Sequence, residues 1–348
     1  MPLARSSLAV AALLLLAPGA ALADVPSVVA SIKPVHSLVA SVMRGVGEPA
    51  LLLDANASPH TYALRPSDAA RLEEADLVFW VGPGVESFLE GTLENLASET
   101  AVVELSETDG LTLLPYREGG AFEAHDHGHD DDSGQAEVAH TEDEAHDHAA
   151  EPHADGAHDH GEGHADHEAH AGHAHEGTDP HVWLDPANAA RIADAIAERL
   201  AEADPENADA YRSNALAIAD RMDVLKSEIS AQMQPLTGRP FLVFHDAFQY
   251  FENAFGVSAS GSLTISPEVA PGARRISELQ ARIEETGTTC LIAEPQFPRE
   301  MIDLLVTEDT RTGVMDEVGA AIDPGPDLYE ALVRANADAL AECLADPA

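Results

Sequence analysis

Basic residues and cysteine are scarce in this sequence. Its 348 residues include 18 Lys and Arg against 62 Asp and Glu, which gives a formal net charge of -44. Because phosphate binding needs clustered Lys and Arg, this charge excludes a nucleic-acid partner. The 2 Cys exclude a disulfide-dense scaffold and a thiolate metal site, since no CxxC spacing exists. Histidine is abundant instead: the 18 His residues point to imidazole chemistry.

Long apolar runs are absent too, apart from a short segment at the start. Residues 1–23 combine Arg5, an apolar run over residues 8–17, and the small-x-small site Ala21-Leu22-Ala23. This three-part pattern predicts a signal peptide that is cleaved near Ala23. The run is too short to span a bilayer, which needs about 20 apolar residues, and no Cys follows it for lipid attachment. We therefore expect a soluble protein in the periplasm, with a retained N-terminal helix as the alternative.

Export also affects how the two cysteines are interpreted. Cys290 opens an apolar run and Cys343 lies in the last helical stretch. In an oxidising compartment an even pair favours one disulfide, which would attach the C-terminal helix to a core strand. Two free buried thiols are the alternative.

A low-complexity insert divides the chain at residues 118–176. It holds 18 acidic residues and no Lys or Arg, and 14 of the 18 His lie between His125 and His175. A segment with so few aliphatic residues cannot bury enough surface to offset its ordering entropy, so it is predicted to be disordered. Its histidine density indicates weak, multiple binding of metals such as Zn, Cu or Ni. A solubilising tether is the alternative.

The rest of the chain alternates between short apolar strands and helices. This order predicts an α/β fold of two doubly wound lobes, with a ligand cleft between them. Between Asp204 and Met233, apolar residues recur at intervals of three and four. That spacing predicts one long, rigid helix that joins the lobes. The expected organisation is an N-terminal lobe over 24–203, a linking helix over 204–235 and a C-terminal lobe over 236–348. The expected strands are 25–32, 50–54, 77–81, 101–105, 241–244, 258–263, 291–293 and 313–315, and the expected helices include 85–96, 271–285 and 301–306.

Three histidines outside the insert occupy positions where a ligand site is expected. His60 and His245 follow the predicted strands 50–54 and 241–244, and open α/β sheets bind ligands at the carboxyl ends of their strands. His181 lies between the insert and a helix that begins at Asp185-Pro186. Three converging imidazoles would form a zinc site with one position left for water or a carboxylate. Taken singly, a histidine is more often a hydrogen-bonded structural residue than a metal ligand.

Weaker candidates surround these three histidines. Asp316 follows the predicted strand 313–315 and ranks first as a further ligand. Glu294 follows strand 291–293 and ranks first as a carboxylate that orients an imidazole without touching the metal. Glu268 lies in a loop, and His36 is interpreted as a helix cap or surface residue. For each carboxylate, a cap or a salt bridge is the alternative.

Several segments together resemble the periplasmic zinc-binding proteins of bacterial zinc ABC importers, the ZnuA-like branch of the cluster A-I metal-binding proteins. The resemblance covers essentially the whole mature chain, and the acidic, His-rich insert is itself a feature of the zinc branch. The matching segments are Ser31-Ile32-Lys33-Pro34, PHTYALRPSDAARLEEADLVFWVGPGVESF from Pro59, DPHVWLDP from Asp179, VFHDAFQYF from Val243, ISPEVAPGARRI from Ile265 and CLIAEPQF from Cys290.

This resemblance implies two lobes joined by one long helix, with the metal in the cleft. It makes His60, His181 and His245 the ligands, and it pairs Cys290 with Cys343. The manganese relatives carry a carboxylate in place of the third histidine, so the resemblance implies zinc. Some zinc relatives have a ligating Glu just before the first histidine. Pro59 stands there in this chain, which leaves the fourth position to water, Asp316 or the insert.

The expected function is therefore capture and delivery of Zn²⁺, bound as a transported ligand. The expected partner is the membrane permease of a zinc ABC importer, with a periplasmic zinc donor as a further candidate, and the chain is expected to be a monomer. A zinc hydrolase is a competing function, although the sequence has no HExxH and no Gly-x-Ser-x-Gly pattern. A periplasmic metal buffer or adhesin that acts through the insert is the other alternative.

Overall fold

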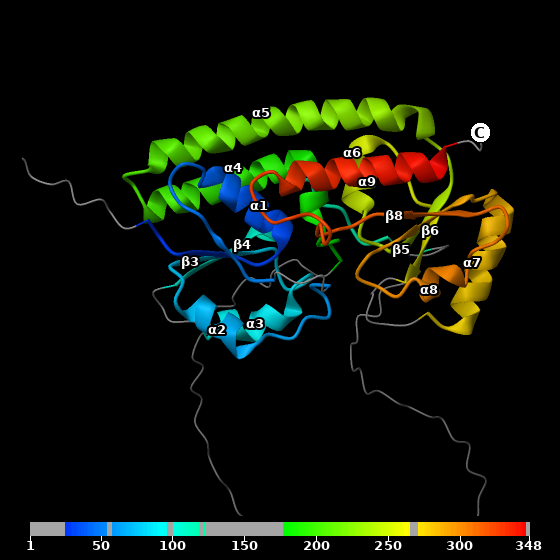
Figure 1. The fold of residues 1–348 in the computed structure, drawn as a ribbon, viewed down its shortest axis with the longest axis horizontal. Helices are drawn as coiled ribbons and strands as arrows, with labels where there is room; N and C mark the ends of the chain where they lie inside the picture. Colours follow the sequence, from blue (N-terminus) through cyan, green and yellow to red (C-terminus); the bar gives the residue numbers. More distant parts are fainter. Residues whose placement is uncertain are drawn as a thin grey trace, which may run out of the picture.

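Two parallel sheets form the framework of the molecule. The computed structural model describes residues 25–53, 58–95, 100–117, 122, 177–264 and 271–345. Both sheets have four strands, and they lie side by side beneath long helices (Figure 1). The N-terminal sheet has β1 (Val28–Ala30), β2 (Ala50–Leu51), β3 (Leu77–Trp80) and β4 (Ala101–Glu104), and the C-terminal sheet has β5 (Phe241–His245), β6 (Gly261–Thr264), β7 (Cys290–Ala293) and β8 (Arg311–Val314).

The two sheets share one topology. Their strand orders are β2-β1-β3-β4 and β6-β5-β7-β8, so the first strand of each sheet lies inside it and the chain winds outward in both directions. All neighbouring strands are parallel. The loops that follow the inner strands therefore leave from one edge of each sheet, where doubly wound folds bind ligands. This finding confirms the predicted fold of two doubly wound lobes.

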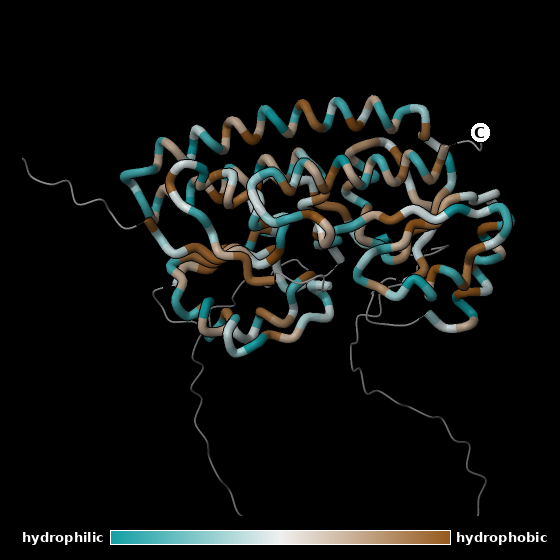
Figure 2. The backbone as a smooth tube through the Cα atoms, in the orientation of Figure 1, coloured by the Kyte–Doolittle hydropathy of each residue, from teal (hydrophilic) through white to brown (hydrophobic). Residues whose placement is uncertain are grey.

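Burial on both sides explains why the inner strands are almost entirely apolar. Every residue of β3 and β5 is buried, as expected for parallel sheets that are covered by helices on both faces. Brown, hydrophobic backbone runs along the strands, while teal and brown positions alternate along the helices (Figure 2). The helices of the N-terminal lobe are α1 (Lys33–Val42), α2 (Pro66–Glu73) and α3 (Ser87–Leu93), and those of the C-terminal lobe are α6 (Gln249–Phe255), α7 (Ala273–Thr286) and α8 (Glu300–Asp303).

One long helix joins the lobes, as predicted. Helix α5 (Ala208–Met233) follows α4 (Pro186–Ala203) and lies along the top of the molecule in Figure 1. Its 26 residues at a rise of 1.5 Å give a length of roughly 39 Å. The periodic side chains that predicted the helix form its buried face: Tyr211, Ala215, Ile218, Met222, Leu225, Ile229 and Met233.

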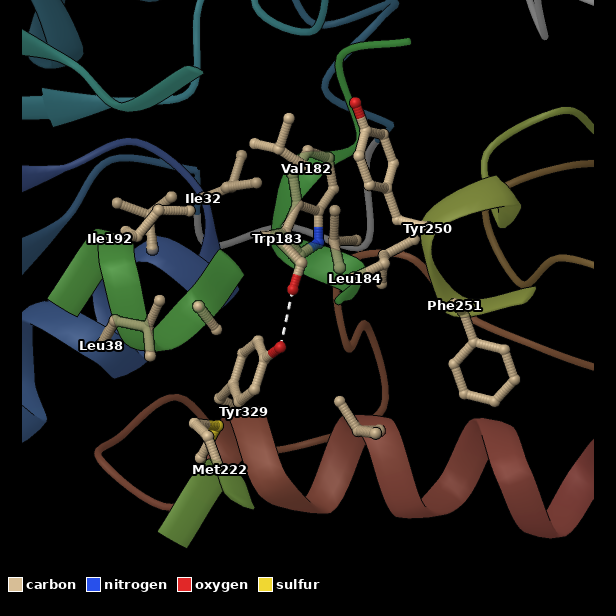
Figure 3. Packing of buried hydrophobic residues seen from close by; sticks show 14 of the residues in the cluster. Ile32, Leu38, Val182, Trp183, Leu184, Ile192, Met222, Tyr250, Phe251 and Tyr329 are labelled. Atoms are coloured by element: carbon tan, nitrogen blue, oxygen red, sulfur yellow. Dashed lines mark hydrogen bonds between the residues drawn. The ribbon is translucent and has the colours of Figure 1, made fainter. Parts of the chain in front are cut away.

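A second helix also connects the lobes. Helix α9 (Leu328–Leu344) begins against α1 and ends over β7 and β8. At its start, the Tyr329 backbone N–H donates to Ser37 Oγ (3.0 Å), and the Tyr329 hydroxyl donates to the Trp183 carbonyl oxygen (2.7 Å; Figure 3). At its end, Cys343 forms the expected disulfide with Cys290 of β7. One hydrophobic cluster extends through both lobes, so the lobes pack as a continuous body.

Gly313 allows helix α9 to pack closely against strand β8. A Cβ built on Gly313 would lie 3.1 Å from the Cys343 Cβ and 3.2 Å from the Ala339 carbonyl oxygen. Glycine at this position therefore lets α9 lie directly against the strand, which brings the two cysteines within bonding reach.

Several element boundaries differ from the expectation. The predicted helix 85–96 covers only Ser87–Leu93, and the predicted helix 301–306 is reduced to Glu300–Asp303. The strand expected at 258–263 begins only at Gly261. The strand expected at 313–315 runs from Arg311 to Val314 and so ends one residue early.

Some expectations concern parts of the chain that the structure does not describe. The predicted signal peptide, nearly all of the insert and Glu268 lie outside the described residues. Among the helices that are described, none has the length and apolar character needed to cross a membrane.

Candidate metal centre

Four side chains from four distant segments converge between the lobes. His60, His181, His245 and Glu317 each bring one potential ligand atom, and these atoms lie within 4.8 Å of one another. The Nε2 atoms of His60 and His181 are 3.3 Å apart. Glu317 Oε2 lies 3.8 Å from His60 Nε2, 3.3 Å from His181 Nε2 and 3.5 Å from His245 Nε2.

Each of these side chains is positioned by a short local structure. His245 is the last residue of β5, and Glu317 follows the end of β8, so both lie at the carboxyl edge of the C-terminal sheet. His60 lies in a turn after β2, where its backbone N–H donates to Ser58 Oγ (3.2 Å). His181 begins the short 3-10 helix Val182–Leu184, whose three side chains are buried and fix the ring that precedes them.

Two carboxylates orient two of the imidazoles. Nδ1–H of His181 donates to Asp179 Oδ1 (2.7 Å), and Nδ1–H of His245 donates to Glu294 Oε1 (2.6 Å). Both carboxylates also accept the backbone N–H of the same histidine. When Nδ1 carries the proton, the Nε2 lone pair is free to bind a metal. Glu294 thus contacts an imidazole as suggested above, whereas Asp179 was missed, although its place two residues before His181 offered a signal.

Burial and neighbouring charges shift the pKa values of all four residues. Burial lowers the pKa of His60. Burial also opposes the charge of His181, but Asp179 and Glu317 outweigh it and raise the pKa of His181 to about 9. Glu294 and Glu317 likewise overcome burial and raise the pKa of His245. In turn the imidazoles, His245 foremost, overcome the burial of Glu317 and hold its pKa well below the ordinary value.

The geometry is close to that of a tetrahedral zinc site. Zinc bonds of about 2.0–2.1 Å at tetrahedral angles place neighbouring ligand atoms roughly 3.3 Å apart. Four of the six separations here are 3.3 to 3.8 Å, and all six are within 4.8 Å. His245 Nε2 and both oxygens of Glu317 are buried without a hydrogen-bond partner. Buried polar atoms are normally satisfied, and a cation between these four residues would supply the interaction that these atoms lack.

The structure brings Glu317, and not Asp316, to the three histidines. The Asp316 carboxylate instead accepts the backbone N–H groups of Val318 and Ala320 and the side-chain amide of Gln296. Glu317 lies three residues beyond Val314, the last residue of β8, so the carboxylate that reaches the histidines comes from the loop after the strand and not from the position directly at its end. His36 is also separate from the centre, since its Nε2 contacts the Pro49 carbonyl oxygen at 3.2 Å.

Comparison with known proteins assigns the chain to a family. A family described as "ZnuA: Zinc-uptake complex component A periplasmic" matches residues 28–343. This chain belongs to that family. It is 45% identical over 331 residues to the high-affinity zinc uptake system protein ZnuA of Brucella abortus (strain 2308), and the match covers 91% of each chain. The protein of the same name from Yersinia pestis is 34% identical over 319 residues, again with 91% of each chain covered.

A solved structure shows the same fold at lower sequence identity. The periplasmic zinc-binding protein TroA from Treponema pallidum superposes with a TM-score of 0.67, at 21% identity, over 92% of this chain and 99% of that one. The family membership and this likeness agree with the two-lobed architecture described above.

Proposed function

We propose that this chain captures one Zn²⁺ ion through His60, His181, His245 and Glu317 and delivers it to a membrane permease. Its family is the periplasmic zinc-binding component of a zinc uptake system. The single observation that carries the ligand assignment is the convergence of three histidines and one carboxylate within 4.8 Å. Zinc is the cargo of this centre, so it must bind tightly and still be released.

The donor set favours zinc over harder divalent cations. Three imidazole nitrogens and one carboxylate oxygen suit a borderline metal, whereas Mg²⁺ and Mn²⁺ prefer oxygen ligands. Glu317 supplies the carboxylate that Pro59 cannot. Because neutral imidazoles are required and His181 has a pKa of about 9, zinc displaces protons as it binds, and its affinity falls in acid.

A closed centre also argues for binding and against catalysis. Catalytic zinc sites keep a position open for water or substrate, whereas structural sites fill all four positions with side chains. Here four protein ligands are available, so a zinc hydrolase is not favoured. We propose that the chain acts as a non-enzymatic monomer, receives zinc in the periplasm after its leader is cleaved near Ala23, and works with the permease of an ABC importer.

Zinc titration of single variants tests the ligand set. Metal-free protein is titrated in competition with a chromophoric chelator, with His60→Ala, His181→Ala, His245→Ala and Glu317→Gln as test variants. Removing a ligand should weaken tight binding by on the order of 100-fold or more, since even groups that only orient ligands contribute 10–100-fold. His36→Ala is the matched control, because this histidine lies outside the centre, and it should bind zinc as the wild type does.

Two outcomes would contradict the proposal. Unchanged tight binding in all four test variants would reject the ligand set. Deletion of residues 122–176 should remove weak sites and leave one tight site. Loss of all tight binding from that deletion would favour the metal-buffer alternative, in which the insert is the active part.

A further inference from the structure

Lys33 connects the N-terminal lobe to the loop that carries Glu317. Its Nζ atom donates to the carbonyl oxygens of Gly319 (3.3 Å), Ala320 (3.0 Å) and Ile322 (3.1 Å). The side chain is 6% exposed. An ammonium group has three N–H donors, and all three are used here on one short loop of the opposite lobe.

The position of Lys33 makes its positive charge energetically unfavourable. Lys33 is the first residue of α1, and the N-terminus of a helix disfavours a cation. Burying an ammonium also costs several kcal/mol unless other groups compensate. In the described part of the chain its compensation comes from carbonyl oxygens and from no carboxylate. A packing role alone would be filled more cheaply by an apolar side chain of similar length.

The loop has little else to hold it from the N-terminal lobe. Trp183 Nε1–H donates to the backbone carbonyl oxygen of Glu317 (2.9 Å). On the other side, Asn336 of α9 pairs with the backbone of Asp316. Gly319 adopts a positive φ of 75°, which turns its carbonyl and those that follow toward Lys33. The Glu317 carboxylate therefore reaches the histidines from a loop that is fixed at its start by Asn336 and Trp183 and farther along by Lys33.

We propose that Lys33 is a positioning residue of the metal centre, which holds the 317–322 loop so that the Glu317 carboxylate stays on the zinc ion. Lys33 does not touch the metal. Its ammonium fixes the backbone two to five residues after the ligand, and this contact crosses the boundary between the lobes. The proposal rests on the proposed function, in which Glu317 is a zinc ligand.

A double-mutant cycle in the full-length chain separates this role from general stabilisation. Zinc affinity is measured for the wild type, Lys33→Met, Glu317→Gln and the double variant by competition with a chromophoric chelator. Lys33→Met should weaken binding about 10-fold, as removal of a group that supports a ligand does. In the Glu317→Gln background the same change should alter the affinity by less than about twofold, because two residues that act through one contact are not additive.

Two further variants serve as controls. Lys226→Met removes the only other lysine of the chain, which pairs with Asp185 on the scaffold (3.2 Å), and it should leave zinc affinity unchanged. Lys33→Gln keeps an N–H donor and should recover part of the lost affinity; it replaces Lys33→Met if that variant does not fold. Thermal unfolding of each metal-free variant reports its stability separately from its affinity.

The possible results are distinct. Wild-type affinity in Lys33→Met, or an equal loss in both backgrounds, overturns the positioning role while leaving the ligand set intact. Wild-type affinity in Glu317→Gln rejects the fourth ligand and with it the role of Lys33. Weakened binding in the histidine variants tests the proposed function independently of both.

Discussion

The two lobes have the same strand order, yet only the C-terminal lobe places a proposed metal ligand on its first strand. In the C-terminal lobe, β5 ends at His245, and the buried Glu294 after β7 orients its ring. In the N-terminal lobe, Ser31 follows β1 directly, and the buried Glu86 lies six residues beyond the end of β3. Glu86 accepts the backbone N–H groups of Val81 and Gly82 with one oxygen and interacts with the Ser31 hydroxyl.

This difference shows how one topology serves two purposes. Both lobes keep a carboxylate at the edge of the sheet, but in the N-terminal lobe it faces a hydroxyl and not an imidazole. That lobe contributes its ligands from connecting segments instead: His60 from a turn, and His181 from the short helix before α4. Both sheets have a carboxyl edge, but metal binding there depends on which side chains stand at the strand ends.

The disulfide is a further difference, and its removal should have the largest effect. Only the C-terminal lobe has one in the described part of the chain, and it closes a sequence separation of 53 residues. The Cys290→Ala/Cys343→Ala variant should lose roughly 4 kcal/mol of unfolding free energy, by the loop-closure estimate. Urea unfolding of the metal-free protein measures this loss against the oxidised wild type, and reduced wild type should unfold as the variant does. A change of less than about 1 kcal/mol would mean that the packing of α9 alone fixes the lobe.

Glu86 should make the unfolding free energy of the metal-free protein depend on pH. Burial raises its pKa from 4.5 to about 7. A raised carboxyl pKa means that the folded state binds the proton more tightly than the unfolded state. The stabilising contribution is therefore complete below about pH 4.5 and is lost as the pH rises through 7. By linkage this shift corresponds to roughly 3 kcal/mol between these limits.

The variant Glu86→Gln isolates that contribution. Its amide oxygen can still accept the N–H groups of Val81 and Gly82, but it does not titrate. Unfolding free energies of both proteins are compared at pH 5 and pH 8. The variant should gain stability relative to the wild type at the higher pH, and a constant difference between the two proteins would refute the assignment.

The smallest predicted effect is a change in zinc affinity. It is tested by comparing variants of the two buried carboxylates, Glu294 and Glu86. Glu294→Gln should weaken zinc binding by about 10-fold, because the His245 ring loses the charge that raises its basicity. Glu86→Gln is the matched control in the other lobe, and it should leave the affinity as it is in the wild type. Equal losses in both variants would show that the carboxylates act through stability and not through His245.

The sequence predicted much of this architecture because its signals are local. The spacing of apolar residues along α5 identified the helix and its buried face. His60, after β2, and His245, the last residue of β5, could be placed because each follows an apolar run of sequence. Glu317 was missed because it lies in the loop after β8, three residues beyond Val314, where no periodicity indicates which side chain turns toward the histidines.

Contacts between distant residues left no comparable signal. Lys33 and Ala320 are 287 positions apart, and nothing in Ser31-Ile32-Lys33-Pro34 indicates which loop it meets. The buried Glu86 resembles any other acidic residue near a helix start. Such roles depend on how the lobes pack, which periodicity and composition do not encode.

The wide spacing of the four ligands along the chain has a consequence for how the metal is acquired. His60 precedes Glu317 by most of the polypeptide, and the other two histidines come from different segments in between. An extended chain would therefore carry no preformed centre of this kind. With the proposed ligand set, zinc could bind tightly only after both halves have folded against each other, so the compartment in which folding finishes would determine which pool of metal the protein samples.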